Sequence, residues 1–263
     1  MQIDRNEVIK RIEPHWKVLD IGSWEDVFPR ANVVLDVCPY ETRKNKYPLE
    51  KECFDKNSWI IGDVNQLETW SQFKDKEFDF VICSHLLEDI RDPLFVCKQL
   101  NRVAKGGYIE CPSRFRECAK LNKSITHAGY DHHRWIFDVI ENDLVFTPKL
   151  HWANHIDYLG DERRNCLKEY RFHFTGVFWK DSFKYYERNP KGAKNETMNL
   201  IYFYDAFNYV DGQFIYDLTK DYQKSDIKAG AFLWVDKYLL PFEKLPLDKI
   251  NDLEALFKKA LGQ

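Results

Sequence analysis

The first half of the chain alternates short apolar runs with polar or helix-forming segments. Each run is continuous rather than alternating, as expected for a strand that is covered on both faces. Strands that alternate with helices form βαβ units and a parallel sheet. The pattern therefore predicts parallel strands over Val18–Ile21, Val33–Val37, Trp59–Ile61, Phe78–Cys83 and Tyr108–Cys111.

The most clearly marked helix is expected over Pro93–Lys105. Asp92 suits its N-cap, and a proline suits its first position. Gly106 is expected to take the left-handed position that ends the helix. Only residues 22–32 connect the first two strands, so the helix predicted between them can have only one or two turns.

After Pro112 the pattern becomes β-rich and less regular. We predict a hairpin over residues 134–150 that turns at Asn142 and Asp143, because two apolar runs flank these turn formers. An amphipathic helix is expected to begin at Asp248. Further strands are expected within residues 174–189, 198–210 and 212–218.

These elements predict an α/β fold with a doubly wound, Rossmann-like sheet and a β-rich C-terminal elaboration. We place the sheet's core in residues 1–115 and the completion of the sheet, with the elaboration, in residues 116–263. The boundary is a change of pattern without a flexible linker, so a single domain is an equal interpretation.

Composition argues against several classes of protein, namely nucleic-acid-binding, membrane-spanning and secreted ones. The formal net charge of −3 argues against a nucleic-acid surface across the whole chain, and no apolar run approaches the roughly 20 residues that span a bilayer. The N-terminus is charged and lacks the apolar segment of a signal peptide. The seven cysteines include no CxxC pair, which indicates a reducing setting. We expect a cytoplasmic protein, and a homodimer stays open.

Acidic residues lie at or just after the ends of three of the five predicted strands: Asp20, Asp36 and Asp63. Ligands of open parallel sheets bind at these strand ends. The first loop holds one glycine, Gly22, where a dinucleotide site carries three, so an NAD-dependent oxidoreductase is the disfavoured alternative. The acidic field favours a cationic ligand rich in hydroxyl groups, such as S-adenosylmethionine, with Trp24 able to face its sulfonium.

Residues 77–113, EFDFVICSHLLEDIRDPLFVCKQLNRVAKGGYIECPS, closely resemble class I S-adenosylmethionine-dependent methyltransferases of the methyltransferase 11 type. VLDIG, VVLDV and IIGDV resemble the three earlier motifs of that family, in the same order, and the resemblance covers roughly residues 15–115. It implies a cofactor site with Asp20 and Gly22 at the methionine, Asp36 at the ribose, Asp63 and Val64 at the adenine, and Ser84 and His85 at the fourth strand. Ser23, Trp24 and Val37 are added to this site from their positions at the strand ends.

The chain departs from the family pattern in four places. Its glycine loop is reduced to Gly22, its first crossover is short, Asp89 replaces a usual histidine, and Ala104 alters the turn that follows the helix. Alternatives also stay open for single residues: Asp20 can orient the loop backbone, Gly22 can be a plain turn residue, and His85 can be a packed residue at a helix N-terminus.

The acceptor pocket is expected around THAGYDHHRW, residues 126–135. His132 or His133 is the candidate base, and in an extended segment only one of the two would face the pocket. The alternative is a loop pinned by hydrogen bonds. The expected acceptor-binding residues are Arg114, Tyr130, Arg134 and Trp135, with Arg43 and Arg116 as further candidates.

No functional metal is expected, although His127, His132, His133, His151 and His155 are close in sequence. No cysteine pair joins them, and the segment with His151 and His155 has no strong helical pattern. We expect O-methylation of a small polar acceptor, such as a sugar, nucleotide sugar or phosphorylated metabolite. The alternative is a catalytically silent partner protein that binds the cofactor.

Overall fold

The computed structural model describes residues 5–43, 52–117, 129–140, 142–149, 173–188 and 215–217. The chain divides into two compact units, and all described residues belong to the one formed by residues 1–188 and 212–222. The predicted strand at 198–210 and the predicted C-terminal helix lie outside the described residues.

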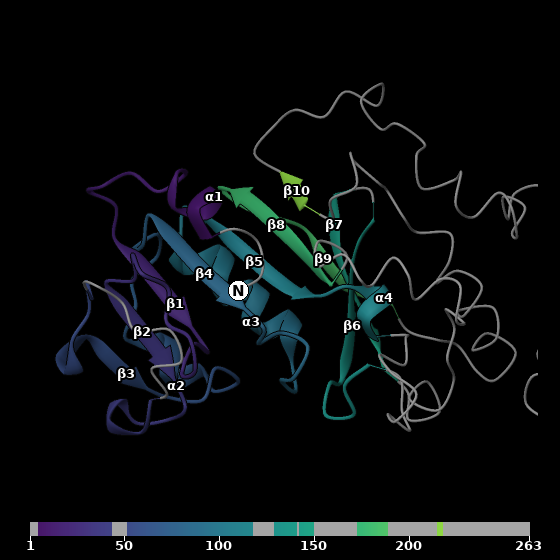
Figure 1. The fold of residues 1–263 in the computed structure, drawn as a ribbon, viewed down its shortest axis with the longest axis horizontal. Coiled ribbons are helices and arrows are strands. Elements are labelled where there is room, and N and C mark those ends of the chain that lie inside the picture. Colours follow the sequence, from purple (N-terminus) through teal and green to yellow (C-terminus); the bar gives the residue numbers. More distant parts are fainter. Residues whose placement is uncertain are drawn as a thin grey trace, which may run out of the picture. The chain divides into compact units, whose positions relative to one another are not determined.

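A seven-stranded sheet with the order β10-β8-β5-β4-β1-β2-β3 forms the body of this unit (Figure 1). The five predicted parallel strands are confirmed, and β8 then pairs antiparallel to β5 and parallel to β10. The strands are β1 (Val18–Ile21), β2 (Val33–Asp36), β3 (Trp59–Ile61), β4 (Phe80–Ser84), β5 (Gly106–Pro112), β8 (Phe174–Lys180) and β10 (Ile215–Asp217).

A second sheet of three strands has the order β6-β7-β9. The predicted hairpin is confirmed: β6 (Trp135–Ile140) and β7 (Asp143–Pro148) pair antiparallel and turn at Asn142, whose φ is 69°. β9 (Tyr185–Glu187) adds to β7 in parallel.

The described helices are α1 (Arg5–Ile9), α2 (Leu67–Ser71), α3 (Pro93–Val103) and α4 (Arg114–Glu117), with 3₁₀ turns η1 (Tyr40–Thr42) and η2 (Lys56–Ser58). α1 and α3 contribute to separate core clusters with alternate residues of the same strands, so they cover opposite faces of the sheet. The doubly wound α/β class is therefore confirmed. No helix of the described residues is long and apolar enough to cross a membrane.

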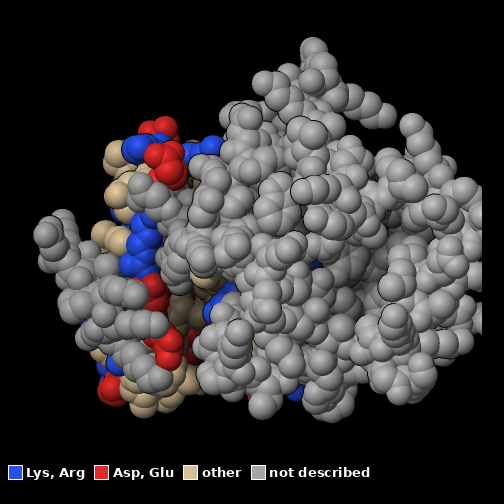
Figure 2. All heavy atoms as spheres, turned by 45° about the vertical axis from the view of Figure 1, so that its right-hand side comes forward, with Lys and Arg blue, Asp and Glu red and all other residues tan. Residues whose placement is uncertain are grey.

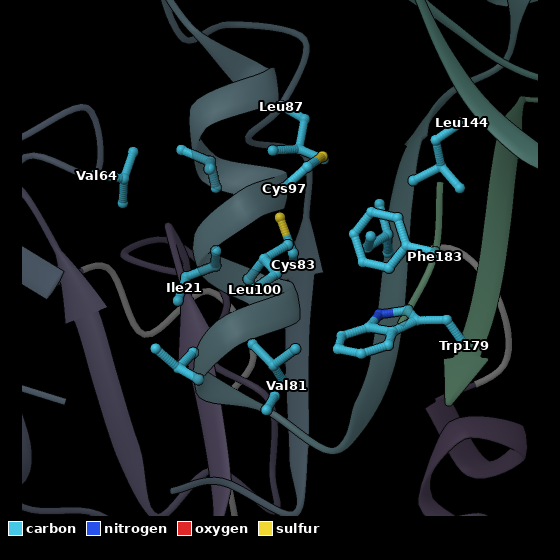
Figure 3. Close-up of a cluster of buried hydrophobic side chains, with 14 of the residues drawn as sticks. Ile21, Val64, Val81, Cys83, Leu87, Cys97, Leu100, Leu144, Trp179 and Phe183 are labelled. Atoms are coloured by element: carbon cyan, nitrogen blue, oxygen red, sulfur yellow. The ribbon is translucent and has the colours of Figure 1, made fainter. Parts of the chain in front are cut away.

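The larger core cluster lies between α3 and the sheet (Figure 3). Cys97 and Leu100 of α3 face Val81 and Cys83 of β4, and all four side chains are buried. This packing fixes the register of α3 over β4, and therefore the direction in which the loop between them leaves the sheet.

Two expectations about local structure are wrong. Gly106 does not end α3 in a left-handed conformation; the helix ends at Val103, Ala104 is extended, and Gly106 begins β5. The glycines here serve close packing, since a Cβ on Gly107 would lie 2.5 Å from the carbonyl oxygen of Val81.

Between β1 and β2, residues 22–32 form turns and no helix. Side chains replace helical hydrogen bonds in this short connection. Asp20 accepts a hydrogen bond from the Phe28 N–H at 2.7 Å, and the side chain of Asn32 accepts one from the Val18 N–H at 2.9 Å.

Candidate functional site

A cavity of about 880 Å³ opens at the carboxyl ends of β1, β4 and β5. The strand order reverses between β1 and β4, which is where ligands of open α/β sheets bind. Residues of the 130–133 segment close its other side. Among its lining residues are these predicted ones: Asp20, Gly22, Ser23, Trp24, Ser84, His85, Tyr130, His132 and His133.

Asp20 joins the β1 strand end to the loop that follows it. Its carboxylate is 2% exposed and accepts the Phe28 N–H, so it orients the loop backbone as the sequence allowed. Burial raises the pKa of Asp20 to about 7, although the hydrogen bond from Phe28 opposes the change. The carboxylate therefore titrates near neutral pH. Gly22, with φ 69°, takes a left-handed conformation at the cavity wall.

His85 is held between two buried carboxylates. Its Nδ1 lies 3.3 Å from Oε1 of Glu88, and its Nε2 lies 3.3 Å from Oε1 of Glu110. Burial alone would lower the pKa of His85, but the two carboxylates outweigh it and raise the pKa to about 9. The backbone of His85 has φ 54°, a conformation rare outside glycine, which this network sustains.

Glu110 completes this network from the middle of β5. It is fully buried, and it accepts hydrogen bonds from the Tyr108 hydroxyl at 2.6 Å and the Ser84 hydroxyl at 3.2 Å. Although burial opposes ionisation, the hydrogen bond and charge of His85 lower the pKa of Glu110 to about 2. His85 and Glu110 are therefore both charged at neutral pH and form a buried ion pair behind the cavity wall.

A second polar cluster lies at the opposite end of the cavity, where residues 130–133 form the wall. His133 is buried, and its Nδ1 lies 2.6 Å from Oε1 of Glu117, whose other oxygen accepts a hydrogen bond from Lys149 at 2.7 Å. Nε2 of His133 and Nε2 of His132 lie 3.7 and 3.9 Å from Oδ1 of Asp89. Both histidines therefore line the cavity, rather than one of them.

Four predicted cofactor residues are not among the lining residues. Asp36 is 5% exposed, and its two oxygens accept the N–H groups of Trp24 and Cys38 at 3.0 and 2.8 Å. Each oxygen can accept a second hydrogen bond, so a ribose contact stays a prediction. Val37, one residue further, is 67% exposed.

The structure places Asp63 and Val64 at the start of the loop between β3 and α2. Asp63 is exposed and accepts hydrogen bonds from the backbone and side chain of Asn65, which lower its pKa. Val64 is buried in the larger core cluster. Their predicted contact with adenine is not tested by these contacts.

Only some of the expected acceptor-binding residues line the cavity. Tyr130 lines the cavity, and its hydroxyl accepts a hydrogen bond from Arg116 at 2.7 Å. Arg114 forms a buried ion pair with Asp138 of β6 instead.

Four other predicted residues are also absent from the cavity lining: Arg43, Arg116, Arg134 and Trp135. Arg134 is exposed, and its N–H donates to the carbonyl of Glu88. The indole of Trp135 donates to the carbonyl of Ile90, and Arg43 pairs with Glu52. His127, His151 and His155 lie outside the described residues.

Sequence reasoning missed Glu88, Glu110 and Glu117 as parts of the site. The sequence could have indicated Glu110, because a carboxylate inside the apolar run of β5 requires a buried polar partner. For Asp89 the sequence shows only a departure from the family pattern, because its position beside two histidines is a tertiary feature.

The comparisons with known proteins decide the family. Residues 4–160, more than half of the chain, match the family model described as methyltransferase domain. The chain belongs to the methyltransferase family. This confirms the resemblance to class I methyltransferases, and the cofactor of this methyltransferase is S-adenosylmethionine. No curated protein matches its sequence significantly.

Solved structures similar to this methyltransferase include an S-adenosylmethionine-dependent methyltransferase from Thermotoga maritima, with 17% identity and a TM-score of 0.31 over 43% of this chain and 52% of that one. One from Archaeoglobus fulgidus has 17% identity and a TM-score of 0.30 over 41% and 50%. A complex between the Haloferax volcanii Trm112 methyltransferase activator and a candidate methyltransferase has 18% identity and a TM-score of 0.32 over 41% and 50%. The aligned part thus spans about half of each of these structures.

The cavity of this methyltransferase fits a cationic cofactor. Its walls carry the carboxylates of Asp20, Glu25, Asp26, Glu88 and Asp89, of which Asp26 pairs with Arg5. Among the described lining residues, acidic side chains outnumber the cationic Arg5 and His85, and this balance favours a sulfonium. On the described surface seen in Figure 2, by contrast, acidic and basic side chains are interspersed.

Proposed function

We propose that this methyltransferase transfers a methyl group to an oxygen atom of a small polar acceptor, such as a sugar, nucleotide sugar or phosphorylated metabolite. One observation carries the proposal: a single cavity joins the C-terminal end of β1 and the loop after it, with Asp20 and Gly22, to the His132–His133 pair. Cofactor and acceptor can therefore share one cavity.

The cofactor end is built from β1 and β4. Asp20, Gly22 and Ser23 would hold the methionine part from one side, with Ser84 and His85 on the other. S-adenosylmethionine supplies an electrophilic methyl group on its positive sulfur. The excess of carboxylates at this wall favours that charge, and Asp36 and Val37 stay the proposed neighbours of the adenosine.

The acceptor end contributes alignment and proton transfer. Displacement at a methyl carbon requires the acceptor atom in line with the sulfur, and holding it there supplies much of the rate. Glu117 on Nδ1 of His133 fixes the ring so that Nε2 points away from Glu117 and can accept the acceptor's proton. His132 and Tyr130 line the same end and would contact the acceptor.

The size and polarity of the cavity support a small acceptor. Its volume of about 880 Å³ lies within the range of small-molecule sites. Tyr130 and Phe174 give it aromatic surfaces, and the carboxylates supply hydrogen-bond acceptors for hydroxyl groups. The five described cysteines are free, which supports the proposed cytoplasmic setting.

The test is calorimetry followed by an acceptor screen. S-adenosylhomocysteine is expected to bind and NAD is not, since the loop carries a single glycine. Sugars, nucleotide sugars and phosphorylated metabolites are then incubated with labelled cofactor, and a methylated product is expected from at least one. Cofactor binding without turnover of any of these would contradict the proposal and favour a silent partner protein.

His133→Asn is the variant that tests the chemical role. We expect it to bind S-adenosylhomocysteine normally and to lose about 10²–10⁴-fold in turnover. Turnover close to that of the wild type would remove His133 from proton transfer while leaving the cofactor assignment intact.

A further inference from the structure

Three side chains at the acceptor end of the cavity bring possible metal-ligand atoms close together. We propose that Asp89, His132 and His133 bind a divalent transition-metal ion. Their ligand atoms all lie within 4.8 Å of one another, and they come from two segments that are 43 residues or more apart in the sequence. Two imidazoles and a carboxylate are a common ligand set for catalytic metals.

The distances suit an ion after a small adjustment. Nε2 of His133 and Nε2 of His132 lie 3.7 and 3.9 Å from Oδ1 of Asp89. With metal–ligand bonds of about 2.0–2.1 Å, tetrahedral neighbours would lie about 3.3 Å apart. The His132 side chain is 63% exposed and can rotate to close the difference.

The second nitrogen of each ring faces a carboxylate. Glu117 lies 2.6 Å from Nδ1 of His133, and Asp131 lies 3.5 Å from Nδ1 of His132. Metal-binding histidines almost always donate their other N–H to a group of this kind, which fixes the tautomer and leaves Nε2 free to bind. Glu117 is itself held by Lys149, so the ring of His133 is preorganised.

Asp89 gives an independent reason for a cation. Its Oδ1 atom is buried, and no donor within the described part of the chain makes a hydrogen bond to it. Glu117 holds the proton on Nδ1 of His133, so the lone pair of Nε2 faces this buried carboxylate oxygen at 3.7 Å. Two acceptors that face one another without a proton between them are unfavourable, and a bound cation would remove this conflict.

Imidazole nitrogen with one carboxylate favours Zn²⁺, Co²⁺ or Ni²⁺ over Mg²⁺ and Ca²⁺, which prefer oxygen ligands. Three protein ligands leave a position open on the cavity side. This role rests on the proposed function: an acceptor hydroxyl at that position would lose its proton to solvent more readily, and His133 would act as a ligand instead of a free base.

Co²⁺ is the probe, because its visible spectrum reports coordination directly. The full chain is freed of metal with a chelator, exchanged into metal-free buffer and titrated with Co²⁺ by calorimetry and absorbance. We expect one ion per chain, with no thiolate-to-cobalt band in the near ultraviolet. Such a band would place the ion on cysteines, such as the exposed Cys53, and would overturn the proposal.

Asp89→Asn and His132→Asn are the diagnostic variants, because both side chains are partly exposed and can be replaced without opening the core. Each is expected to abolish Co²⁺ binding. His15→Asn, at an exposed histidine outside the cavity, is the matched control and should bind as the wild type does. Unchanged binding in Asp89→Asn, or no binding in the wild type, would overturn the metal site.

S-adenosylhomocysteine binding separates this inference from the proposed function. Retained binding in both variants shows that they are folded and that loss of the ion is local. A wild type that binds S-adenosylhomocysteine but not Co²⁺ refutes the metal site alone. If chelated enzyme keeps full turnover, the free imidazole is the base and the proposed role of the ion is wrong.

Discussion

Oε1 of Glu117 lies 2.6 Å from Nδ1 of His133, and the two side chains are 1% and 6% exposed. The second oxygen of Glu117 accepts a hydrogen bond from Lys149, whose side chain is fully buried. Because the carboxylate is acceptor-only, Nδ1 of His133 must carry the proton. Nε2, which lies 3.7 Å from Oδ1 of Asp89, is then the nitrogen that can react, so the contact with Glu117 selects the reactive nitrogen of His133.

Glu117→Gln tests this relationship through metal affinity. The amide keeps the shape of the side chain but weakens its hold on the Nδ1–H of His133. We expect Co²⁺ to bind about 10–100-fold more weakly, as for other second-shell substitutions. Calorimetry gives the affinity, and S-adenosylhomocysteine should bind as before. Glu77→Gln, in a partly exposed pair with Lys17, is the control. Equal Co²⁺ affinity in the two variants would show that Glu117 is only structural.

Asp20 predicts proton release when the cofactor binds. Its pKa of about 7 means that the carboxyl is partly protonated at neutral pH. A positive sulfonium nearby favours the ionised form, so binding should release protons at pH 7. Calorimetry of S-adenosylmethionine in buffers of different ionisation enthalpy measures the number released. The neutral sulfur of S-adenosylhomocysteine should release fewer.

Asp20→Asn is the control for this linkage. We expect proton release at pH 7 to fall close to zero in this variant, whereas the same number as in the wild type would assign it to another group. Stability gives a second check. The folded pKa of Asp20 lies above its ordinary value of 3.8, so its contribution to stability is complete below pH 3.8 and lost as pH rises toward 7. Asp20→Asn should remove this slope.

Glu110→Gln should strongly destabilise the fold. The substitution leaves the His85 imidazolium without one of its two carboxylates, and breaking a buried ion pair typically costs about 3–5 kcal/mol. Denaturant unfolding at pH 7 measures the loss. The partly exposed Lys17–Glu77 pair is the comparison, and Glu77→Gln should cost less than about 1 kcal/mol.

The pH dependence of the same network has two limits. The pKa of Glu110 is lowered to about 2, so its contribution is present above 4.5 and is lost as pH falls through 2. The pKa of His85 is raised to about 9, so its contribution is present below 6.5 and is lost as pH rises through 9. A Glu110→Gln variant whose stability profile matches the wild type at both limits would contradict this network.

The fold was largely predictable because its signal is local. Continuous apolar runs in β1, β4 and β5 identify strands buried on both faces, and Asn142 marks the hairpin turn. The connection between β1 and β2 was not predictable in detail. Its turns depend on hydrogen bonds from Asp20 and Asn32 to distant backbone groups, and these have no periodic signature.

The site was predictable to a smaller extent. Asp20, Gly22 and His85 are strand-end residues, so the sheet alone brings them together. Arg114 also follows a strand end, which predicted a contact with the acceptor. It instead pairs with Asp138, which belongs to the other sheet and could not be recognised as its partner from the sequence. The clustering of Asp89 with His132 and His133 likewise arises from tertiary contacts, such as the hydrogen bond from the Arg134 N–H to the Glu88 carbonyl.

Replacing Gly22 should be costly because of its left-handed backbone conformation and not because of contacts with neighbouring side chains. An added Cβ would lie 2.8 Å from Cδ1 of Leu86, but that is the end of a flexible side chain and can shift. The φ of 69° cannot be relieved in this way, and a left-handed alanine costs about 1–2 kcal/mol. We therefore expect Gly22→Ala to destabilise the protein by this amount and to weaken S-adenosylhomocysteine binding.

Two further variants distinguish the backbone from the contact. Gly22→Asn should be tolerated better than Gly22→Ala despite its larger side chain, since asparagine adopts left-handed conformations more readily. In a Leu86→Ala background the contact is gone, so most of the cost of Gly22→Ala should remain. Denaturant unfolding and calorimetry with S-adenosylhomocysteine measure both effects. If Leu86→Ala instead rescues Gly22→Ala fully, crowding at the cavity wall is what requires glycine there.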